Sequence, residues 1–143
     1  MQYIDHAYRL GTPSLLKTAE EVMTANPVSI SEHRTVEEAT AFLIYRNFRG
    51  APVINDAGRP VGFVSQADLL AHLSEADGDS HESRERKVSQ DMSFPVITVP
   101  RAATLERVIQ LMISRGVNRV FVTDRGSTLV GVISTLDVLR GLF

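Results

Sequence analysis

The sequence contains no cysteine. This absence excludes a disulfide scaffold, a thiolate metal site and a cysteine nucleophile. No apolar run approaches the roughly 20 residues that span a bilayer, and the opening residues MQYIDHAYRL lack the basic and then apolar layout of a signal peptide. We therefore expect a cytoplasmic protein that does not enter a membrane.

An excess of charge of one sign is also lacking. The 15 Lys and Arg residues nearly balance the 17 Asp and Glu residues, for a net charge of −2, so there is no basic field to attract nucleic acid or an anionic membrane. With 43% hydrophobic and 22% charged residues, the composition is typical of a folded globular protein. The length suits one ordinary domain, or two very small domains that share a core.

What the chain does contain is an internal repeat. The heptad GFVSQAD at 62–68 returns as GVISTLD at 131–137, an offset of 69 residues. The register holds from 23 to 70, and eleven residue pairs are identical where chance gives roughly three. The identical pairs are Met23/Met92, Thr35/Thr104, Glu37/Glu106, Ile44/Ile113, Arg46/Arg115, Val53/Val122, Val61/Val130, Gly62/Gly131, Ser65/Ser134, Asp68/Asp137 and Leu70/Leu139. Two copies are too few for a solenoid, so we expect them to pack face to face.

Residues 74–87, SEADGDSHESRERK, separate the two copies and contain no large apolar side chain. Such a segment buries too little surface to offset its ordering entropy, which predicts a solvated linker. A metal loop is the alternative, because Asp77, Asp79, His81 and Glu82 lie close together, but their spacing matches no calcium loop. The histidines at 6, 33, 72 and 81 also lack a metal-binding spacing.

Hydrophobic periodicity gives both copies the same order of elements. In the first copy we expect a helix over 14–24 that ends before Pro27, a strand over 28–30, and a helix capped by Thr35. A hairpin of strands 51–54 and 61–64 follows, and Ser65 caps a last helix with Asp68 at its third position. In the second copy the expected elements are a strand over 96–99, a helix over 104–115, strands over 119–123 and 129–133, and a helix from Ser134 to the end.

The repeated unit is therefore β-α-β-β-α, which predicts an α/β (α+β) fold with two sheets. Each half has about 60 residues and buries little surface by itself. We therefore expect the two sheets to pack together around a shared core.

This order of elements, the duplication and the two heptads together resemble a tandem pair of cystathionine-β-synthase (CBS) domains, often called a Bateman module. EVMTANPVSISEHRTVEEA and VSQDMSFPVITVPRAATLERV resemble the openings of the two domains, and GAPVINDAGRPVGFVSQADLL and VNRVFVTDRGSTLVGVISTLDVL resemble their ends. The resemblance implies an N-terminal arm 1–14, a first CBS domain 15–73, a linker 74–86 and a second CBS domain 87–143, packed sheet to sheet as a pseudo-twofold pair. It also implies a homodimer of modules and an adenosine-containing ligand (AMP, ADP, ATP or S-adenosylmethionine), with no required cofactor.

In this family the ligand sites mix the two copies. The resemblance implies one site in which Asp137, Ser134, Thr135 and Arg119 face Thr24, Ser29, Phe48 and Arg49, and a second in which Asp68 and Ser65 face Ser93, Thr98, Val117 and Asn118. Val28 and Ile97 either flank the adenine ring or belong to the strand core. We favour the Asp137 site, because it has more groups suited to phosphate.

The roles of the paired residues stay open at this point. The resemblance implies that Asp68 and Asp137 accept hydrogen bonds from ribose hydroxyls, whereas their position also suits plain helix capping. Ser65 and Ser134 are expected N-caps, and the free N–H groups beside them also suit phosphate. The family often has a His-Arg pair before its second strand; here the second copy has Asn118-Arg119 and the first has Arg49-Gly50.

Two functions compete. The resemblance implies a regulatory sensor that binds the adenosine-containing ligand and signals to an unidentified partner protein. The missing His and the Gly at position 50 favour a ligand-free dimerisation scaffold instead. An enzyme is not expected, because the sequence has no nucleophile elbow and no Ser-His-Asp signature.

Overall fold

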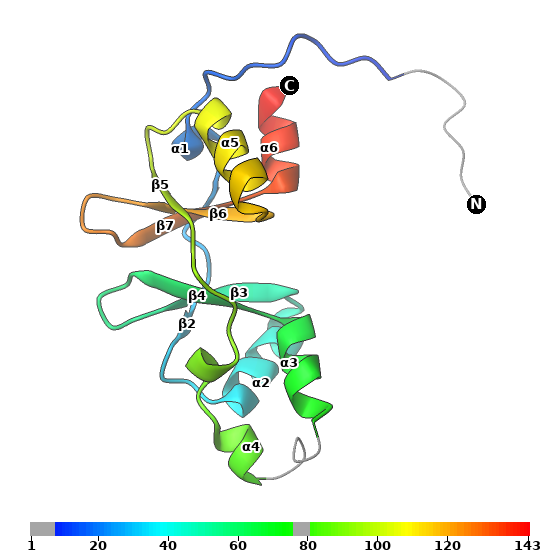
Figure 1. The fold of residues 1–143 in the computed structure, drawn as a ribbon, viewed down its shortest axis with the longest axis vertical. Helices are drawn as coiled ribbons and strands as arrows, with labels where there is room; N and C mark the ends of the chain where they lie inside the picture. Colours follow the sequence, from blue (N-terminus) through cyan, green and yellow to red (C-terminus); the bar gives the residue numbers. More distant parts are fainter. Residues whose placement is uncertain (1–7, 76–80) are drawn as a thin grey trace.

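The computed structural model describes residues 8–75 and 81–143. The molecule has two halves stacked along its long axis, each with one sheet and with helices on the outer face of that sheet (Figure 1). The inner faces of the two sheets lie opposite each other at the middle of the molecule. The predicted α/β fold with two repeats packed sheet to sheet is therefore confirmed.

The first half contains strands β2 (Ile30–Ser31), β3 (Gly50–Ile54) and β4 (Pro60–Ser65). β2 runs parallel to β3, and β3 pairs antiparallel with β4, as the hairpin prediction required. Helices α2 (Val36–Arg46) and α3 (Gln66–Leu73) cover the outer face. Thr35 and Glu38 form a capping box that starts α2, which confirms the predicted cap.

The second half repeats this plan with β5 (Thr98–Pro100), β6 (Arg119–Thr123) and β7 (Leu129–Ser134). Its outer helices are α5 (Leu105–Arg115) and α6 (Thr135–Leu142). β5 is parallel to β6, and β6 is antiparallel to β7. The hairpin register is also the same, because Gly50 lies opposite Ser65 in one half and Arg119 lies opposite Ser134 in the other.

Each half also includes the opening segment of the other sequence copy. Helix α1 (Ala19–Val22) and strand β1 (Thr24–Ala25) come before the first repeat's sheet, yet β1 pairs antiparallel with β7 of the second half. In the reciprocal place, Ser93 bridges Phe63 of β4. The two opening segments therefore cross between the sheets and join the halves.

The hydrophobic interior forms two cores instead of the single shared core that we expected. One core lies between the first sheet and its helices and includes Val36, Val53 and Val64; the other includes Leu105, Val120 and Ile133. The apolar side of each sheet is covered by its own helices, so the inner faces keep room for a cleft. Contact between the inner faces includes the rings of Phe63 and Phe121, whose centroids are 6.3 Å apart.

The first predicted helix is much shorter than expected. Residues 14–17 are not helical, because their backbone groups bond the second half: the Ser14 N–H donates to Leu142 O at 2.7 Å, and Lys17 O accepts the Leu105 N–H at 2.8 Å. Within the described residues, no helix is both long enough and apolar enough to cross a membrane.

The last residues of the predicted linker are exposed for the most part, but they form regular structure. Helix α4 (His81–Glu85) packs on α2, and a 3₁₀ turn, η1 (Val88–Gln90), follows it. Arg86 O accepts the Val36 N–H at 2.7 Å, which ties this segment to the start of α2. Of the residues considered for a metal loop, Asp77 and Asp79 lie outside the described residues.

Candidate functional site

Helices α3 and α6 begin with matching capping boxes. Ser65 Oγ accepts a hydrogen bond from the Asp68 N–H at 3.1 Å, and Asp68 Oδ2 accepts the Ser65 N–H at 2.8 Å. Ser134 and Asp137 form the same two bonds at 3.2 and 2.9 Å. The capping role predicted for both pairs is therefore confirmed.

Capping leaves one carboxylate oxygen of Asp68 with acceptor capacity. The Ser65 N–H and hydroxyl both bond Oδ2, at 2.8 and 2.9 Å. Oδ1 accepts a long contact of 3.4 Å from the Ser93 hydroxyl. Because a carboxylate offers about four acceptor positions, capping and ribose binding are compatible at this residue.

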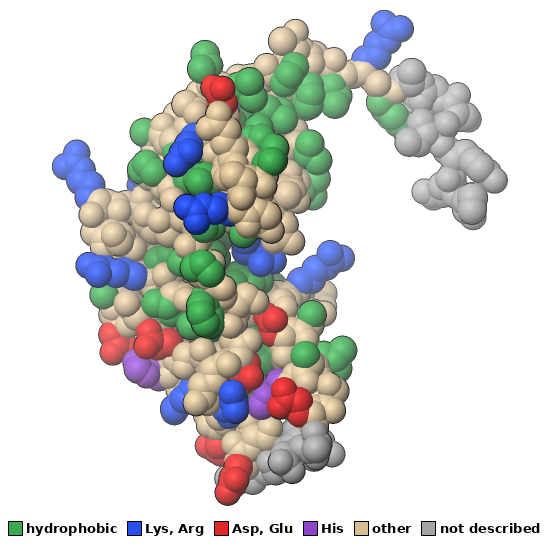
Figure 2. Space-filling model, in the orientation of Figure 1, with side chains coloured by type: hydrophobic (Ala, Val, Ile, Leu, Met, Phe, Trp, Pro, Cys, Tyr) green, Lys and Arg blue, Asp and Glu red, His purple; other side chains and the backbone are tan. Residues whose placement is uncertain are grey.

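A cleft of about 800 Å³ lies between the two halves; Asp68 does not line it, but Ser93, whose hydroxyl contacts Asp68 Oδ1, does. Phe63 of β4 forms one wall, and the opposite walls come from residues 93–97, the end of α5 and β6. Figure 2 shows hydrophobic side chains at the middle of the molecule, where the halves meet. The apolar lining includes Phe94, Ile97 and Val117, and the polar lining includes Ser93, Asn118, Arg115 and Arg119. Apolar walls with a few polar groups are typical of a small-molecule site.

Arg119 is a half-buried cation in this cleft. Its Cζ atom lies 3.6 Å from the centroid of the Phe63 ring, a cation–π contact. Desolvation lowers the pKa of Arg119, and the charge of Asp68 opposes that shift. Among the described residues no carboxylate forms an ion pair with its guanidinium, which stays protonated. An anionic group in the cleft would therefore compensate a charge that the protein leaves only partly compensated.

The residues expected around Asp68 come together in the structure. Ser93, Ile97, Val117 and Asn118 all line the cleft. Thr98 follows directly at the start of β5, where its side chain is exposed. Their contact with a ligand remains a prediction.

The residues expected around Asp137 are arranged differently. Arg119 lies opposite Ser134 in the β6–β7 ladder, but its guanidinium lies over Phe63 on the Asp68 side of the cleft. The structure thus groups Arg119 with Asp68 rather than with Asp137. Asp137 lines a separate pocket of about 300 Å³ with Lys17 and Arg140.

Other members of the expected Asp137 group make local contacts. Thr24 lies opposite Val132 in the β1–β7 pair, the Ser29 hydroxyl donates to Pro27 O at 3.2 Å, and the Thr135 N–H donates to Asn118 O at 3.2 Å. The Phe48 ring lies 5.9 Å from that of Phe42, next to the first core. Arg49 is exposed, and Val28 is 43% exposed, so Val28 is not a core strand residue.

Sequence reasoning missed Phe63, which forms a wall of the cleft and supports Arg119. A signal was available in the repeat. At the 69-residue offset, Phe63 corresponds to Val132 and Gly50 to Arg119, so the two copies differ in size and charge beside otherwise matching heptads.

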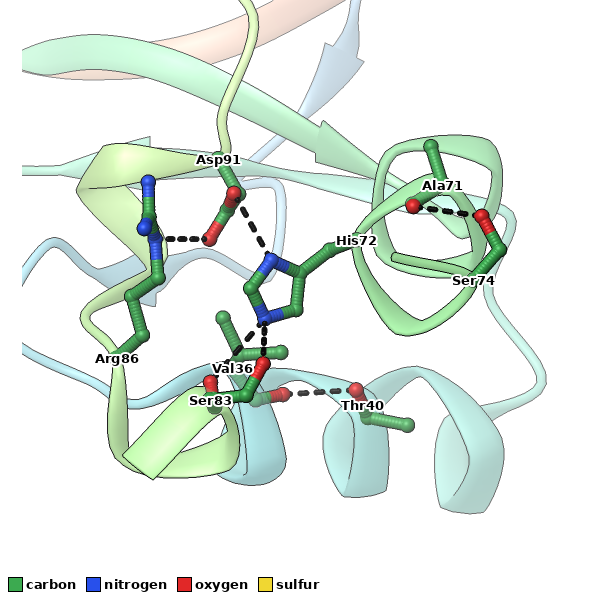
Figure 3. Close-up of polar contacts among 8 residues, drawn as sticks. All are labelled: Val36, Thr40, Ala71, His72, Ser74, Ser83, Arg86 and Asp91. Atoms are coloured by element: carbon green, nitrogen blue, oxygen red, sulfur yellow. Dashed lines mark hydrogen bonds and ion pairs between the residues drawn. The ribbon is translucent and has the colours of Figure 1, made fainter. Parts of the chain in front are cut away.

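A second buried polar cluster lies away from the cleft, where α3 meets α4 and η1 (Figure 3). His72 is 5% exposed; its Nδ1 is 3.3 Å from Asp91 Oδ1, and its Nε2 is 2.7 Å from the Ser83 hydroxyl. Arg86 Nε lies 3.2 Å from Asp91 Oδ2. The cluster fastens the linker to α3. No group of three or more metal-type ligands occurs in the described part of the chain.

Two solved structures illustrate the similarity of the fold. CBSX2, crystallised in complex with AMP, is 27% identical with a TM-score of 0.70, and the match covers 86% of this chain and 93% of that one. The CBS domain pair of protein MJ0100, in complex with 5′-methylthioadenosine and S-adenosyl-L-methionine, is 20% identical with a TM-score of 0.70, and the match covers 87% and 94% of the two chains.

Two curated relatives come from Methanocaldococcus jannaschii. An uncharacterized protein is 26% identical over 84% of this chain and 41% of its own length, and inosine-5′-monophosphate dehydrogenase is 26% identical over 87% of this chain and 23% of its own length. The chain therefore spans less than half of either relative. The CBS domain family itself matches twice, at residues 19–75 and 87–143. The chain belongs to the CBS domain family and contains two CBS domains in tandem.

Proposed function

We propose that this CBS pair is a regulatory sensor that binds an adenosine-containing ligand in the cleft beside Asp68. The observation that carries the proposal is the half-buried Arg119, which lacks an ion-pair partner among the described residues and lies near the Asp68 carboxylate. In this arrangement Asp68 Oδ1 accepts ribose hydroxyls, Arg119 pairs with a phosphate, and Ile97 and Val117 contact the adenine. The complex of CBSX2 with AMP supports the choice of an adenosine-containing ligand.

The regulatory part of the proposal follows from the place of the cleft. Its walls come from both halves, so a ligand binds more tightly to the arrangement in which both walls contact it and shifts the population towards that arrangement. The sensor then reports to a partner protein, without catalysis and without a required cofactor, and we assign it to the cytoplasm.

A thermal-shift screen tests the proposal. The purified protein is heated with AMP, ADP, ATP, S-adenosylmethionine or NAD, and with GMP as the control for the base. A ligand present at about 100 times its Kd adds roughly 2.7 kcal/mol to stability, so at least one adenosine ligand is expected to raise the melting temperature by several degrees. No rise with any adenosine compound would contradict the sensor function.

A second function, a dimerisation scaffold, is favoured by the outer helix faces. Ile44, Leu70, Ile113 and Leu139 are 68%, 70%, 78% and 58% exposed. They form two of the identical pairs of the repeat, so both halves present the same apolar positions. We propose that a second copy covers these faces. Light scattering is expected to give a dimer that Ile44→Lys together with Ile113→Lys converts to a monomer; a monomeric wild type at high concentration would contradict the dimer.

A further inference from the structure

The two copies carry the same Ser and Asp caps, yet their surroundings at the cleft differ. Positions 50 and 119 correspond across the repeat, and so do positions 63 and 132. The first copy has Gly50 with Phe63, and the second has Arg119 with Val132. In each copy a large residue at one position goes with a small residue at the other.

The Phe63 ring and the Val64 carbonyl group together explain why position 50 has no side chain. A Cβ atom on Gly50 would lie 2.5 Å from Phe63 Cε1, 2.8 Å from Phe63 Cζ and 2.8 Å from the Val64 carbonyl oxygen. Protein side chains do not approach this closely in a packed interior. The first copy therefore has no cation at the position that Arg119 occupies in the second.

The same ring holds the cation of the second copy on the Asp68 side. Arg119 Cζ is 3.6 Å from the centre of the Phe63 ring, and burial and the Asp68 charge both act on its guanidinium. A guanidinium stacked on a ring keeps its N–H donors in its own plane, free to bind a phosphate. Phe63 thus blocks a cationic side chain at position 50 and supports the cation at position 119 on the Asp68 side.

The opening segments of the two copies also make the two sides unequal. On the Asp137 side the Asn26 N–H donates to Val130 O at 2.9 Å, which extends the contact of this segment with β7. The corresponding residue on the Asp68 side is Pro95, which has no N–H to donate. Pro95 lies instead on the wall of the cleft of about 800 Å³.

Building on the function proposed above, we infer that each chain binds one adenosine ligand, on the Asp68 side, and that Phe63 is the residue that makes the two sides unequal. Asp137 serves as the cap of α6. The pseudo-twofold symmetry of the fold is thereby broken at the level of ligand binding.

Isothermal titration with AMP, or with S-adenosylmethionine if the thermal screen ranks it higher, tests the inference on the full chain. The wild type is expected to bind one ligand per chain. Two matched pairs of variants locate the bound ligand. Asp68→Asn is compared with Asp137→Asn, which changes the equivalent helix cap. Arg119→Gln is compared with Arg49→Gln, which removes an arginine that corresponds to Asn118 in the repeat. With AMP, the Asp68 and Arg119 variants are expected to bind at least tenfold more weakly, and the other two within twofold of the wild type.

The outcomes separate this inference from the proposed function. Two ligands per chain, or an equal loss of affinity in Asp137→Asn and Asp68→Asn, would overturn the single-site inference while the sensor function stands. A titration without heat, supported by a flat thermal screen, would overturn both. If the cap variants melt at a lower temperature than the wild type, the Arg119 and Arg49 pair decides, because neither residue caps a helix.

Discussion

The Nδ1 atom of His72 lies 3.3 Å from Oδ1 of Asp91, with side-chain exposures of 4% and 13%. A pair of the same chemical type lies on the surface, where His33 Nε2 is 3.1 Å from Asp56 Oδ1 at exposures of 61% and 86%. The two distances are similar, but one pair is buried and the other is exposed. Comparing the two pairs therefore measures how much burial adds to the stability that a His–Asp pair contributes.

Asp91→Ala is expected to lower the free energy of unfolding by about 2 kcal/mol, because His72 and Arg86 both lose a charged partner. Asp56→Ala is the matched control and should cost less than about 0.5 kcal/mol, since an exposed pair is screened by water. Urea unfolding measures both values. Equal losses would show that the buried cluster does not fasten the linker.

Gly62→Ala is expected to destabilise the protein by about 1–3 kcal/mol, because the added methyl group meets Met92. A Cβ at this position would lie 2.7 Å from Met92 Cγ. Met92→Ala removes the side chain that the added methyl group meets. The double variant of Gly62→Ala with Met92→Ala should therefore be more stable than the sum of the two single effects predicts. A double-mutant cycle by thermal unfolding measures this coupling, and strict additivity would contradict it.

Glu38 gives a prediction about acid stability. The hydrogen bond from the Thr35 backbone, followed by the bond from Arg34, lowers the pKa of Glu38 below its ordinary value of 4.5. Because the folded-state pKa is the lower one, the stabilisation is complete above the unfolded value and is lost as the pH falls through the folded value. Glu38→Ala should therefore lower the melting temperature at about pH 7, and the difference from the wild type should shrink towards about pH 3.

The control for this measurement is Glu106→Ala in the first turn of α5, where the third helical residue is Arg107 and no capping box forms. The difference between Glu106→Ala and the wild type should change less with pH. A constant effect of Glu38→Ala across the same pH range would rule out the capping carboxylate as its source.

Phe63→Leu is expected to weaken binding of the adenosine ligand by about threefold to tenfold, because Arg119 loses a cation–π contact of roughly 1 kcal/mol and its fixed position. Phe42→Leu is a matched control, since it removes a second aromatic ring that contacts an arginine, Arg46 at 5.8 Å, away from the cleft. Calorimetric titration of both variants tests the role of Phe63. Equal affinity in Phe63→Leu and the wild type would remove Phe63 from the site.

The sequence predicted the features that depend on neighbours along the chain. The capping boxes of Ser65 with Asp68 and of Ser134 with Asp137 join residues three apart, so their chemistry is readable as a local pattern. The hairpins and the duplication were equally clear, because hydrophobic periodicity and the offset of 69 residues need no knowledge of tertiary contacts.

Features set by distant contacts were not predicted. The helix expected over 14–24 shortened because Lys17 bonds Leu105 of the other half, and His72 is buried because Ser83 and Asp91 fold back onto it. The side of the cleft that holds Arg119 depends on the Phe63 ring, which comes from the other sheet. Comparing the copies pair by pair would have drawn attention to Phe63 and to Arg119, but not to the contact between them.

The crossing of the opening segments governs how the chain reaches its native state. Val88 and Met92 contribute to the first core, and Ala19 and Met23 to the second, so neither core is complete without chain from the other copy. During synthesis the first half cannot complete its core until residue 92 has been made. Contacts between residues that are far apart in the sequence slow folding. Because each core includes residues of the other copy, we expect the two halves to unfold together, and a ligand bound between them should slow amide exchange in the outer helices of both.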